Sequence, residues 1–164
     1  MWYQVKAYLK FLLQSTNQHG VHSPFVYDFV TKGLYKTENN LVSLNSFPEF
    51  KNLTNKEKKV VSKIINYFKI KEIQIKNTYS IKDLDKNHKT LIYKNIKNKY
   101  LDKIIDSKLK SCILINGIHQ NKKAELKWLE IIKNKNATVT IDVFYFGIIF
   151  FRSEQVKEHF NIRS

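Results

Sequence analysis

Hydrophobic side chains recur every three or four positions in the N-terminal part of the chain, which is the spacing of one face of an α-helix. The first such segment covers residues 2–14, and its apolar members are Trp2, Val5, Leu9, Leu12 and Leu13. The second begins after Ser23 and Pro24, which suit the N-cap and the first helical position. Its apolar face consists of Phe25, Val26, Phe29, Val30 and Leu34. The pattern therefore predicts two amphipathic helices in this part of the chain.

A third helix is predicted to begin after Thr54. Thr54 and Glu57 form a T-x-x-E capping box, in which each side chain satisfies a backbone N–H at the start of the helix. The apolar stripe that follows consists of Val60, Val61, Ile64, Ile65 and Phe68. Residues 37–53, which include Pro48, are predicted to form a loop between the second and third helices.

After the third helix, short apolar runs alternate with helical segments. The predicted strands are 72–76, 90–93 and 111–116, and the predicted helices are 98–107 and 121–134. The run 138–152 is strongly β-prone, and Gly147 offers a break at which it can turn back as an antiparallel hairpin. This alternation is typical of an α/β fold. We expect one compact unit, with an N-terminal helical segment at 1–53 followed by an α/β domain at 54–164.

The composition is that of a basic globular protein. The chain has 164 residues, 43% of them hydrophobic, with 29 lysine and arginine residues against 14 acidic ones and a net charge of +15. Its single cysteine, Cys112, excludes a disulfide framework and a cysteine-rich metal site and fits a reducing compartment. The N-terminus lacks the cleavage site of a signal peptide, and no apolar run reaches the ~18 residues of a membrane span. We therefore expect a cytoplasmic protein that is not bound to a membrane.

The positive charge is concentrated in the middle of the chain. Residues 51–110 carry seventeen lysines against six acidic residues, which accounts for +11 of the net +15. Such a field favours a polyanionic partner, nucleic acid first and an anionic membrane surface second. All but two of the cations are lysines, which give a phosphate a point charge without the bidentate fork of arginine. The alternative is that a coding bias toward Lys, Asn and Ile produced solvated lysines that have no partner.

Both ends of the chain resemble a known family. The segment from Ser15 to Val26, with its His19-Gly20-Val21-His22-Ser23-Pro24 core, resembles the N-terminal signature of a group of bacterial class I S-adenosylmethionine (SAM) dependent methyltransferases. The segments 138–142, 147–152 and 157–160 resemble the last two strands and the tail of the same family. This resemblance implies a Rossmann-like methyltransferase sheet with a C-terminal antiparallel hairpin. Here the sheet would be reduced to about five strands.

The middle of the chain departs from that family where its chemistry resides. The family follows its first strand with a glycine-rich loop that lets the backbone approach the cofactor, whereas this chain has no glycine between Gly33 and Gly117. Lys94 stands where an acid normally follows the fourth strand, and Asn116 and Gly117 replace an Asp pair after the fifth. The departures imply a protein with no SAM cofactor, no metal and no catalytic residues.

The spacing of the strands points to a deletion. Only about a dozen residues separate the predicted strands 72–76 and 90–93, too few for the two βα units that complete the cofactor half of the sheet. Lysines have gathered along this gap and on the helix before it. The candidate RNA-binding residues are Lys56, Lys58, Lys59, Lys63, Lys69, Lys71, Lys76, Lys82, Lys86, Lys89, Lys94, Lys97 and Lys99. We expect them to contact RNA phosphates on a scaffold that has lost its active site.

Three other groups of residues have competing interpretations. His19, His22 and His119 suggest a metal site, but they lack further ligands at suitable spacing, and the first two fit a turn that precedes a helix. Cys112 lies inside a predicted buried strand with nothing but His119 to activate it as a nucleophile. The aromatic residues of 144–151 can stack bases, but in a hairpin they more often belong to the core.

Three functions remain open from the sequence. The first is a non-catalytic RNA-binding protein, specifically a component of the ribosome, guessed to be in the large subunit, with rRNA and neighbouring ribosomal proteins as its partners and no small-molecule substrate. The second is a SAM-dependent methyltransferase that binds its cofactor by an unusual route or after pairing with a complete paralogue. The third is an inactive methyltransferase-like subunit that stabilises another protein, with its lysines facing an acidic surface.

Overall fold

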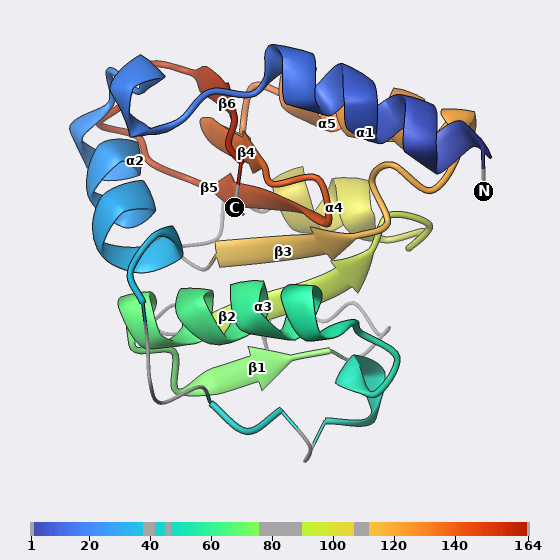
Figure 1. The fold of residues 1–164 in the computed structure, drawn as a ribbon, viewed down its shortest axis with the longest axis horizontal. Helices are drawn as coiled ribbons and strands as arrows, with labels where there is room; N and C mark the ends of the chain where they lie inside the picture. The colour runs from blue at the N-terminus through green and yellow to red at the C-terminus, as the bar shows by residue number, and fades with distance from the viewer. Residues whose placement is uncertain (1, 38–41, 45–46, 76–89, 107–111, 164) are drawn as a thin grey trace.

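The computed structural model describes residues 2–37, 42–44, 47–75, 90–106 and 112–163 and forms a mixed sheet with helices on both faces (Figure 1). The strands are β1 Glu72–Gln74, β2 Thr90–Asn95, β3 Cys112–Asn116, β4 Val139–Asp142, β5 Phe146–Phe150 and β6 Glu158–Asn161. The α-helices are α1 Trp2–Gln14, α2 Pro24–Phe29, α3 Asn55–Phe68, α4 Leu101–Asp106 and α5 Lys122–Lys133. A π-helical turn at Val30–Leu34 extends α2, and short 3-10 turns lie at Gln18–Gly20 and Pro48–Phe50. The predicted α/β class is confirmed.

The six strands lie in the order β1-β2-β3-β5-β4-β6. β1, β2 and β3 are parallel, β5 runs antiparallel to both β3 and β4, and β6 is parallel to β4. All strands except β5 therefore point the same way, and their carboxyl ends meet at one edge of the sheet. The sheet has one strand more than the roughly five expected, because residues 158–161 form a strand of their own.

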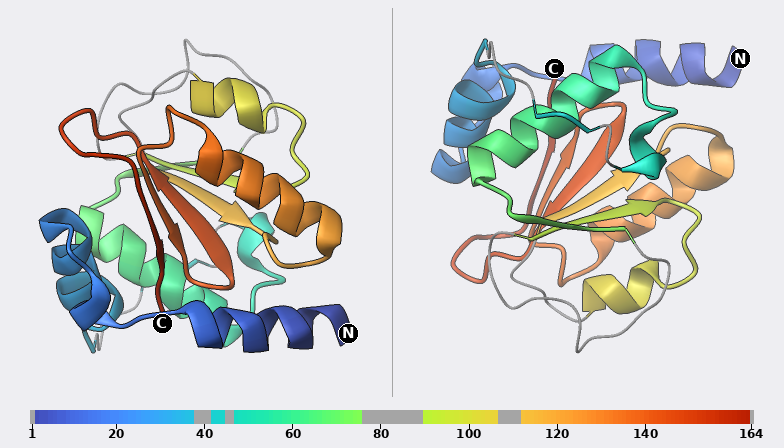
Figure 2. Two further views of the ribbon diagram at one scale, coloured as in Figure 1. Left: turned by 90° about the horizontal axis from the view of Figure 1, so that it is seen from above. Right: turned by 90° about the horizontal axis from the view of Figure 1, so that it is seen from below.

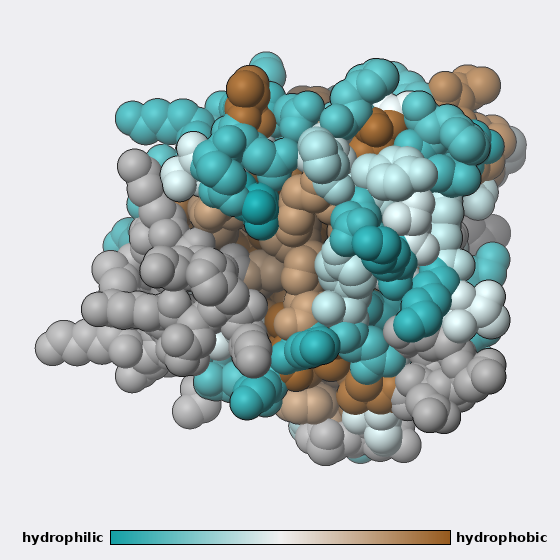
Figure 3. All heavy atoms as spheres, turned by 90° about the vertical axis from the view of Figure 1, so that its left-hand side faces the viewer, coloured by the Kyte–Doolittle hydropathy of each residue, from teal (hydrophilic) through white to brown (hydrophobic). Residues whose placement is uncertain are grey.

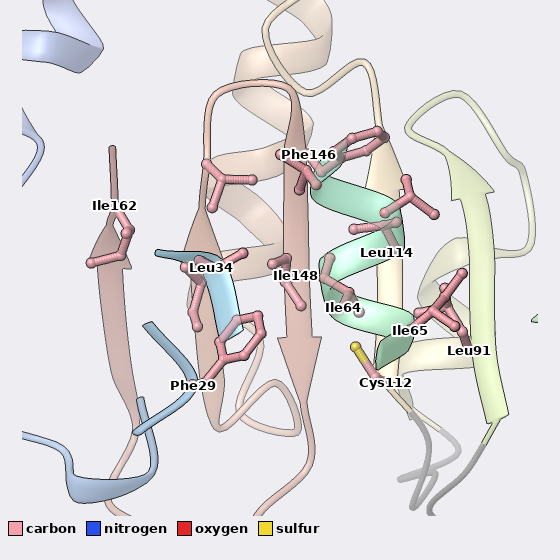
Figure 4. Packing of buried hydrophobic residues seen from close by; sticks show 14 of the residues in the cluster. Phe29, Leu34, Ile64, Ile65, Leu91, Cys112, Leu114, Phe146, Ile148 and Ile162 are labelled. Atoms are coloured by element: carbon pink, nitrogen blue, oxygen red, sulfur yellow. The ribbon is translucent and has the colours of Figure 1, made fainter. Parts of the chain in front are cut away.

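Helices cover both faces of the sheet, with α2 and α3 on one side and α4 and α5 on the other (Figure 2). In Figure 4, Phe29 and Ile64 point from α2 and α3 toward Leu114 and Ile148 of the central strands. Trp128 of α5 belongs to the core cluster on the opposite face. Because both faces are covered, β3, β4 and β5 are buried along almost their whole length.

The second and third helices begin where their sequences predict. The Ser23 hydroxyl accepts a hydrogen bond from Val26 N at 3.4 Å, with Pro24 in the first helical turn. At α3, the Thr54 side chain accepts from Glu57 N while the Glu57 carboxylate accepts from Thr54 N at 2.7 Å, so the predicted capping box is confirmed.

On the side that holds α2 the surface is mainly hydrophilic, with an apolar band between hydrophilic residues (Figure 3).

The first helix has the predicted bounds but buries a different face. Trp2 is 79% and Leu13 89% exposed, whereas the buried side chains of α1 are Ala7 and Phe11. Helical spacing therefore located the helix correctly. Of its predicted apolar face, Leu12 is half-buried, whereas Trp2, Val5, Leu9 and Leu13 are exposed. The helix lies across the end of the sheet, where Phe11 meets the β4–β5 turn and Ala7 faces α5. Only a narrow part of its surface is needed for that contact.

The C-terminal hairpin also differs from the prediction in one respect. It turns at residues 143–145, where Phe144 adopts a positive φ of 65°, and not at Gly147. Gly147 lies within β5, pressed against the ring of Trp128: a Cβ atom there would come within 2.6 Å of the indole. The glycine is required by the close approach of a side chain from α5, which the local sequence does not reveal.

The two ends of the chain are joined beside β6. Thr16 N donates to Asn161 O at 2.8 Å, and Arg163 N donates to Thr16 O at 3.3 Å. The segment that follows α1 therefore pairs with the chain at the carboxyl end of β6. Across the described ranges, none of the helices has the length and apolar character needed to traverse a membrane.

Candidate anion-binding cleft

A cleft of about 430 Å³ opens at the edge of the sheet where the carboxyl end of β4 lies. It lies between α1, α3 and the β4–β5 turn, which both views of Figure 2 place beside one another. Its described lining residues are Tyr8, Phe11, Leu12, Leu34, Lys56, Lys59, Val60, Lys63, Val143, Phe144, Tyr145 and Arg163. In open α/β sheets, ligands bind most often at the carboxyl ends of the strands, so the location itself favours a binding site.

One wall of the cleft is cationic. Lys56, Lys59 and Lys63 come from one side of α3, three and four residues apart, and Arg163 reaches the cleft from the C-terminal end. Among the described lining residues there is no acidic side chain. Among the residues that the structure describes, no carboxylate forms an ion pair with any of these four cations. Four positive charges thus surround a concave space, which concentrates their field on whatever enters it.

Lys63 is held in place by the backbone. Its ammonium group donates to the Leu34 carbonyl at the end of the π-helical turn. This contact joins α3 to the segment that extends α2 and fixes the Lys63 side chain in the lining of the cleft. Lys56 and Lys59 are exposed, and their ammonium groups are available to a ligand.

The opposite wall is aromatic. Phe144 packs against Tyr8 with ring centroids 4.8 Å apart in an edge-to-face arrangement, and against Tyr145 at 5.6 Å. Phe11 closes the cluster from α1, with its ring centroid 5.6 Å from that of Phe144. Tyr8 is 39% exposed, while Phe144 and Tyr145 are half-buried. The aromatic surface is therefore built jointly by the first helix and the last hairpin.

Asp142 fixes the turn that carries this wall. Its Oδ1 atom accepts a hydrogen bond from Phe144 N at 2.7 Å, and its Oδ2 atom accepts one from Trp128 Nε1 at 3.1 Å. His119 Nε2 lies 2.7 Å from the same Oδ2 atom, and the His119 ring stacks on Phe144 with an interplanar angle of 12°. The carboxylate is 3% exposed. Its three partners show why a buried charge is tolerated at the end of β4.

The structure distributes the predicted lysines unevenly. It brings Lys56, Lys59 and Lys63 together in the cleft, where they join an arginine that the sequence reasoning did not include. The other exposed or half-exposed members lie outside the cleft, and they are Lys58, Lys69, Lys71, Lys97 and Lys99. The remaining candidates Lys76, Lys82, Lys86 and Lys89 lie outside the described residues.

Lys94 does not belong to an RNA-contacting surface. It is only 5% exposed within β2, and its ammonium group donates to the Ile75 carbonyl at 3.4 Å. Burial lowers the pKa of Lys94 because removal from water disfavours its charged form. The prediction that this lysine contacts phosphate is therefore wrong. Strand β2 runs to Asn95, beyond the predicted end at residue 93, so Lys94 lies inside the strand.

A second cleft of similar size lies between α1, α5 and the end of β4. Its lining mixes both signs of charge, with Lys10 beside Glu125 and Asp142. Within the described ranges, no group of three or more His, Cys, Asp or Glu side chains is placed to hold a metal ion. His19 and His22 are both exposed, and the Asn17 side chain caps the 3-10 turn that contains His19.

The positions at which the chain departs from the methyltransferase pattern have structural partners. Asn116 Nδ2 donates to the Tyr93 hydroxyl at 2.8 Å, and Gly117 adopts a positive φ of 82° in the turn that follows β3. Cys112 is buried in β3, and burial raises the pKa of its thiol, which disfavours the nucleophilic thiolate. Residues 77–80, which stand where the family has its glycine loop, lie outside the described residues.

Comparisons with protein-family models, with curated proteins and with solved structures found no match. The resemblance to methyltransferases therefore rests on the sequence motifs alone.

Proposed function

We propose that this protein is a non-catalytic RNA-binding protein whose main contact with RNA is the cationic wall of the cleft. The observation that carries the proposal is the convergence of Lys56, Lys59, Lys63 and Arg163 on one concave space without an acidic residue among its described lining. The mutual repulsion of these four like charges around one cleft disfavours the folded state. A phosphate backbone relieves that repulsion and releases counterions when it binds.

The charge of the whole chain supports a polyanion over a small anion. The net charge of +15 would steer any polyphosphate toward the protein. The cleft is a concave site whose lining includes four cations, so a polyphosphate can bind there. The predominance of lysine favours contacts to phosphate over reading of base sequence.

We propose that the protein acts in the cytoplasm, and that it is a ribosomal component that contacts rRNA in the large subunit.

The absence of catalysis is part of the proposal. It is supported by the sequence departures at Lys94, Asn116 and Gly117, positions at which related enzymes carry acidic residues. In this chain the first of these positions is a buried lysine and the second is an amide bonded to a tyrosine hydroxyl. A scaffold derived from an enzyme would then serve as a body that binds RNA.

The proposal is tested by reversing two cleft charges. We expect Lys56→Glu/Lys59→Glu to weaken binding of a short fluorescein-labelled single-stranded RNA, measured by fluorescence anisotropy across a salt series. The slope of log K against log salt should become shallower by roughly 0.7 for each phosphate contact that is lost. Both substitutions lie near the N-terminus of α3, where acidic residues favour the helix, so the fold should be kept.

A matched control is offered by the other face of the sheet. Lys123→Glu/Lys135→Glu alters exposed lysines on α5 and just after it, and changes the net charge by the same amount. If the cleft is the binding site, this control loses far less affinity than the cleft pair. Equal losses in the two variants would mean that RNA responds only to total charge, and no loss in either would refute RNA binding at the cleft.

A further inference from the structure

We propose that the cleft accepts one nucleotide of single-stranded RNA, with its phosphate on the cationic wall and its base stacked on the aromatic wall formed by Tyr8, Phe144 and Tyr145. This inference rests on the proposed RNA binding and specifies which form of RNA the site takes. A free nucleoside monophosphate carries the same phosphate and base, and the experiment below distinguishes it from a nucleotide within an RNA strand.

The two walls face the same space. Lys56 and Lys59 come from α3, while Tyr8 comes from α1 and Tyr145 from the β4–β5 turn, and all four line the one cleft. A nucleotide has the same division, with an anionic phosphate at one end and a flat π-face at the other. Proteins that bind single strands combine a positively charged groove with aromatic rings on which bases stack. The volume of about 430 Å³ lies within the range of sites that enclose small molecules.

The aromatic wall is held by a strained turn. Phe144 has a φ of 65°, a conformation that disfavours residues with a side chain, and Asp142 Oδ1 holds it there by accepting from Phe144 N. Strain of this kind persists where the surrounding structure enforces it, and it is concentrated at functional sites. Here His119 stacks on the Phe144 ring and Trp128 donates to Asp142, so that the turn is fixed from the core side. The ring is in place before any ligand arrives.

Tyr8 and Tyr145 both line the cleft, whereas the ring of Phe144, the third member of this wall, is already stacked on His119. Tyr8 is 39% exposed and touches Phe144 with its ring edge-on, at an interplanar angle of 70°. Tyr145 is half-buried and meets Phe144 at an angle of 80°. A base in a duplex is paired and stacked within the helix and cannot enter the cleft, whereas an unpaired base can be turned outward. The site should therefore distinguish single-stranded from double-stranded RNA.

The test measures the affinity of the full chain for three probes: a short single-stranded RNA, the same sequence as a duplex, and adenosine 5′-monophosphate. We expect Tyr8→Ala and Tyr145→Ala each to weaken binding of the single strand by about 5- to 150-fold, which corresponds to roughly 1–3 kcal/mol of stacking per base. Tyr8→Phe and Tyr145→Phe should bind as the parent does, because they keep the ring. Stacking involves no counterion, so the alanine variants should leave the salt slope unchanged.

Tyr27→Ala is the matched control, since Tyr27 is 46% exposed on α2 and does not line the cleft. Circular dichroism and urea unfolding identify any variant that has lost its fold. If an alanine variant does not fold, the phenylalanine variants and the comparison of the three probes test the nucleotide site in its place. Equal affinity for the single strand and the duplex would overturn the nucleotide site, and so would alanine variants that bind the single strand as the parent does. Either result leaves the proposed RNA binding to be judged separately, from the effect of Lys56→Glu/Lys59→Glu. Tight binding of the monophosphate with weak binding of the strand would assign the cleft to a free nucleotide instead.

Discussion

At the scale of single residues, Gly147 shows how tightly the sheet and α5 are packed. A Cβ atom at this position would lie 2.6 Å from two carbons of the Trp128 ring. We expect Gly147→Ala to lower the free energy of unfolding by about 1–3 kcal/mol, because the core must shift to accept one methyl group. Urea denaturation followed by circular dichroism measures this loss.

The control variant removes the outer ring of Trp128, the group with which the added Cβ atom would collide. In a Trp128→Phe background the outer ring of the indole is absent, so adding Gly147→Ala should cost much less there than in the parent. Trp128→Phe has its own cost, because it gives up the hydrogen bond to Asp142, and the double-mutant cycle separates the two effects. Equal costs of Gly147→Ala in both backgrounds would contradict the steric explanation.

Sequence reasoning placed the hairpin turn at Gly147 because glycine is the residue that most readily adopts turn conformations. The turn is instead carried by Phe144, which no propensity scale would select for a positive φ. The deciding interactions come from Asp142, two residues away, and from His119 and Trp128 on other elements. The strand content of this segment could be predicted locally, whereas the position of its turn depended on tertiary contacts.

At the scale of elements, α1 is attached to α5 through one carboxylate. The Tyr3 hydroxyl and the Lys10 ammonium group both donate to Glu125, the latter at 3.0 Å. The hydrogen bond from Tyr3 is the main reason that the pKa of Glu125 is lowered. Burial, together with the carboxylate, raises the pKa of Tyr3 to about 12. The ionised acid and the neutral phenol therefore stabilise one another.

We expect Glu125→Gln to loosen α1, seen as faster amide hydrogen exchange in residues 2–14 at neutral pH. The difference in stability between parent and variant should depend on pH. Because folding lowers the pKa of Glu125, its contribution is present above the ordinary value near 4.5 and is lost as the pH falls through the folded value. Because folding raises the pKa of Tyr3, the contribution of the phenol is present below about pH 10 and is lost as the pH rises toward 12.

Urea unfolding of both proteins over this pH range checks the prediction. Glu130→Gln is the control, because Glu130 is exposed on the same helix and pairs with Lys127 and not with α1. A stability difference for Glu125→Gln that stays constant from acid to alkaline pH would show that ionisation is not what holds the helix.

The same helix shows where periodicity alone falls short. Spacing of three and four residues predicted the bounds of α1 correctly, but Trp2 and Leu9 of the named stripe face solvent. Periodicity reports that a helix can bury one face, and it does not report which neighbours are present to cover that face. For α3, whose stripe faces a sheet, the same reasoning was correct for Val60, Val61, Ile64 and Ile65, which are buried, while Phe68 is half-buried.

At the scale of the whole molecule, the α/β class followed from the sequence and the cleft did not. Alternating helices and strands predicted the α/β class, and the charge count located the positive charge in residues 51–110, which include α3. The cleft unites Tyr8, Lys59, Tyr145 and Arg163, which are distant in sequence and are brought together by the sheet order and by the contact of Thr16 with β6. No local pattern carries that information.

The proposed cellular setting makes a prediction for the intact particle. In sucrose gradients of cell lysate, we expect the protein to migrate with the large ribosomal subunit, to stay there at moderate salt, and to move to the top after RNase treatment. Cationic contacts to phosphate should weaken steadily as the salt concentration rises. Lys56→Glu/Lys59→Glu should shift toward the top at lower salt than Lys123→Glu/Lys135→Glu. Migration at the top under every condition would contradict a ribosomal role, and RNase-resistant comigration would point to a protein partner.

The walls of the cleft come from both ends of the chain: Tyr8 lies in the first helix, and Tyr145 and Arg163 lie in the last elements. A ribosome releases the chain from its N-terminus onward, so α1 emerges long before the hairpin and the strand that complete the site. The cleft of the nascent protein is therefore incomplete until Arg163 has been added. Copies that end before the hairpin lack Tyr145 and Arg163, so the proposed RNA binding would favour molecules that contain both residues.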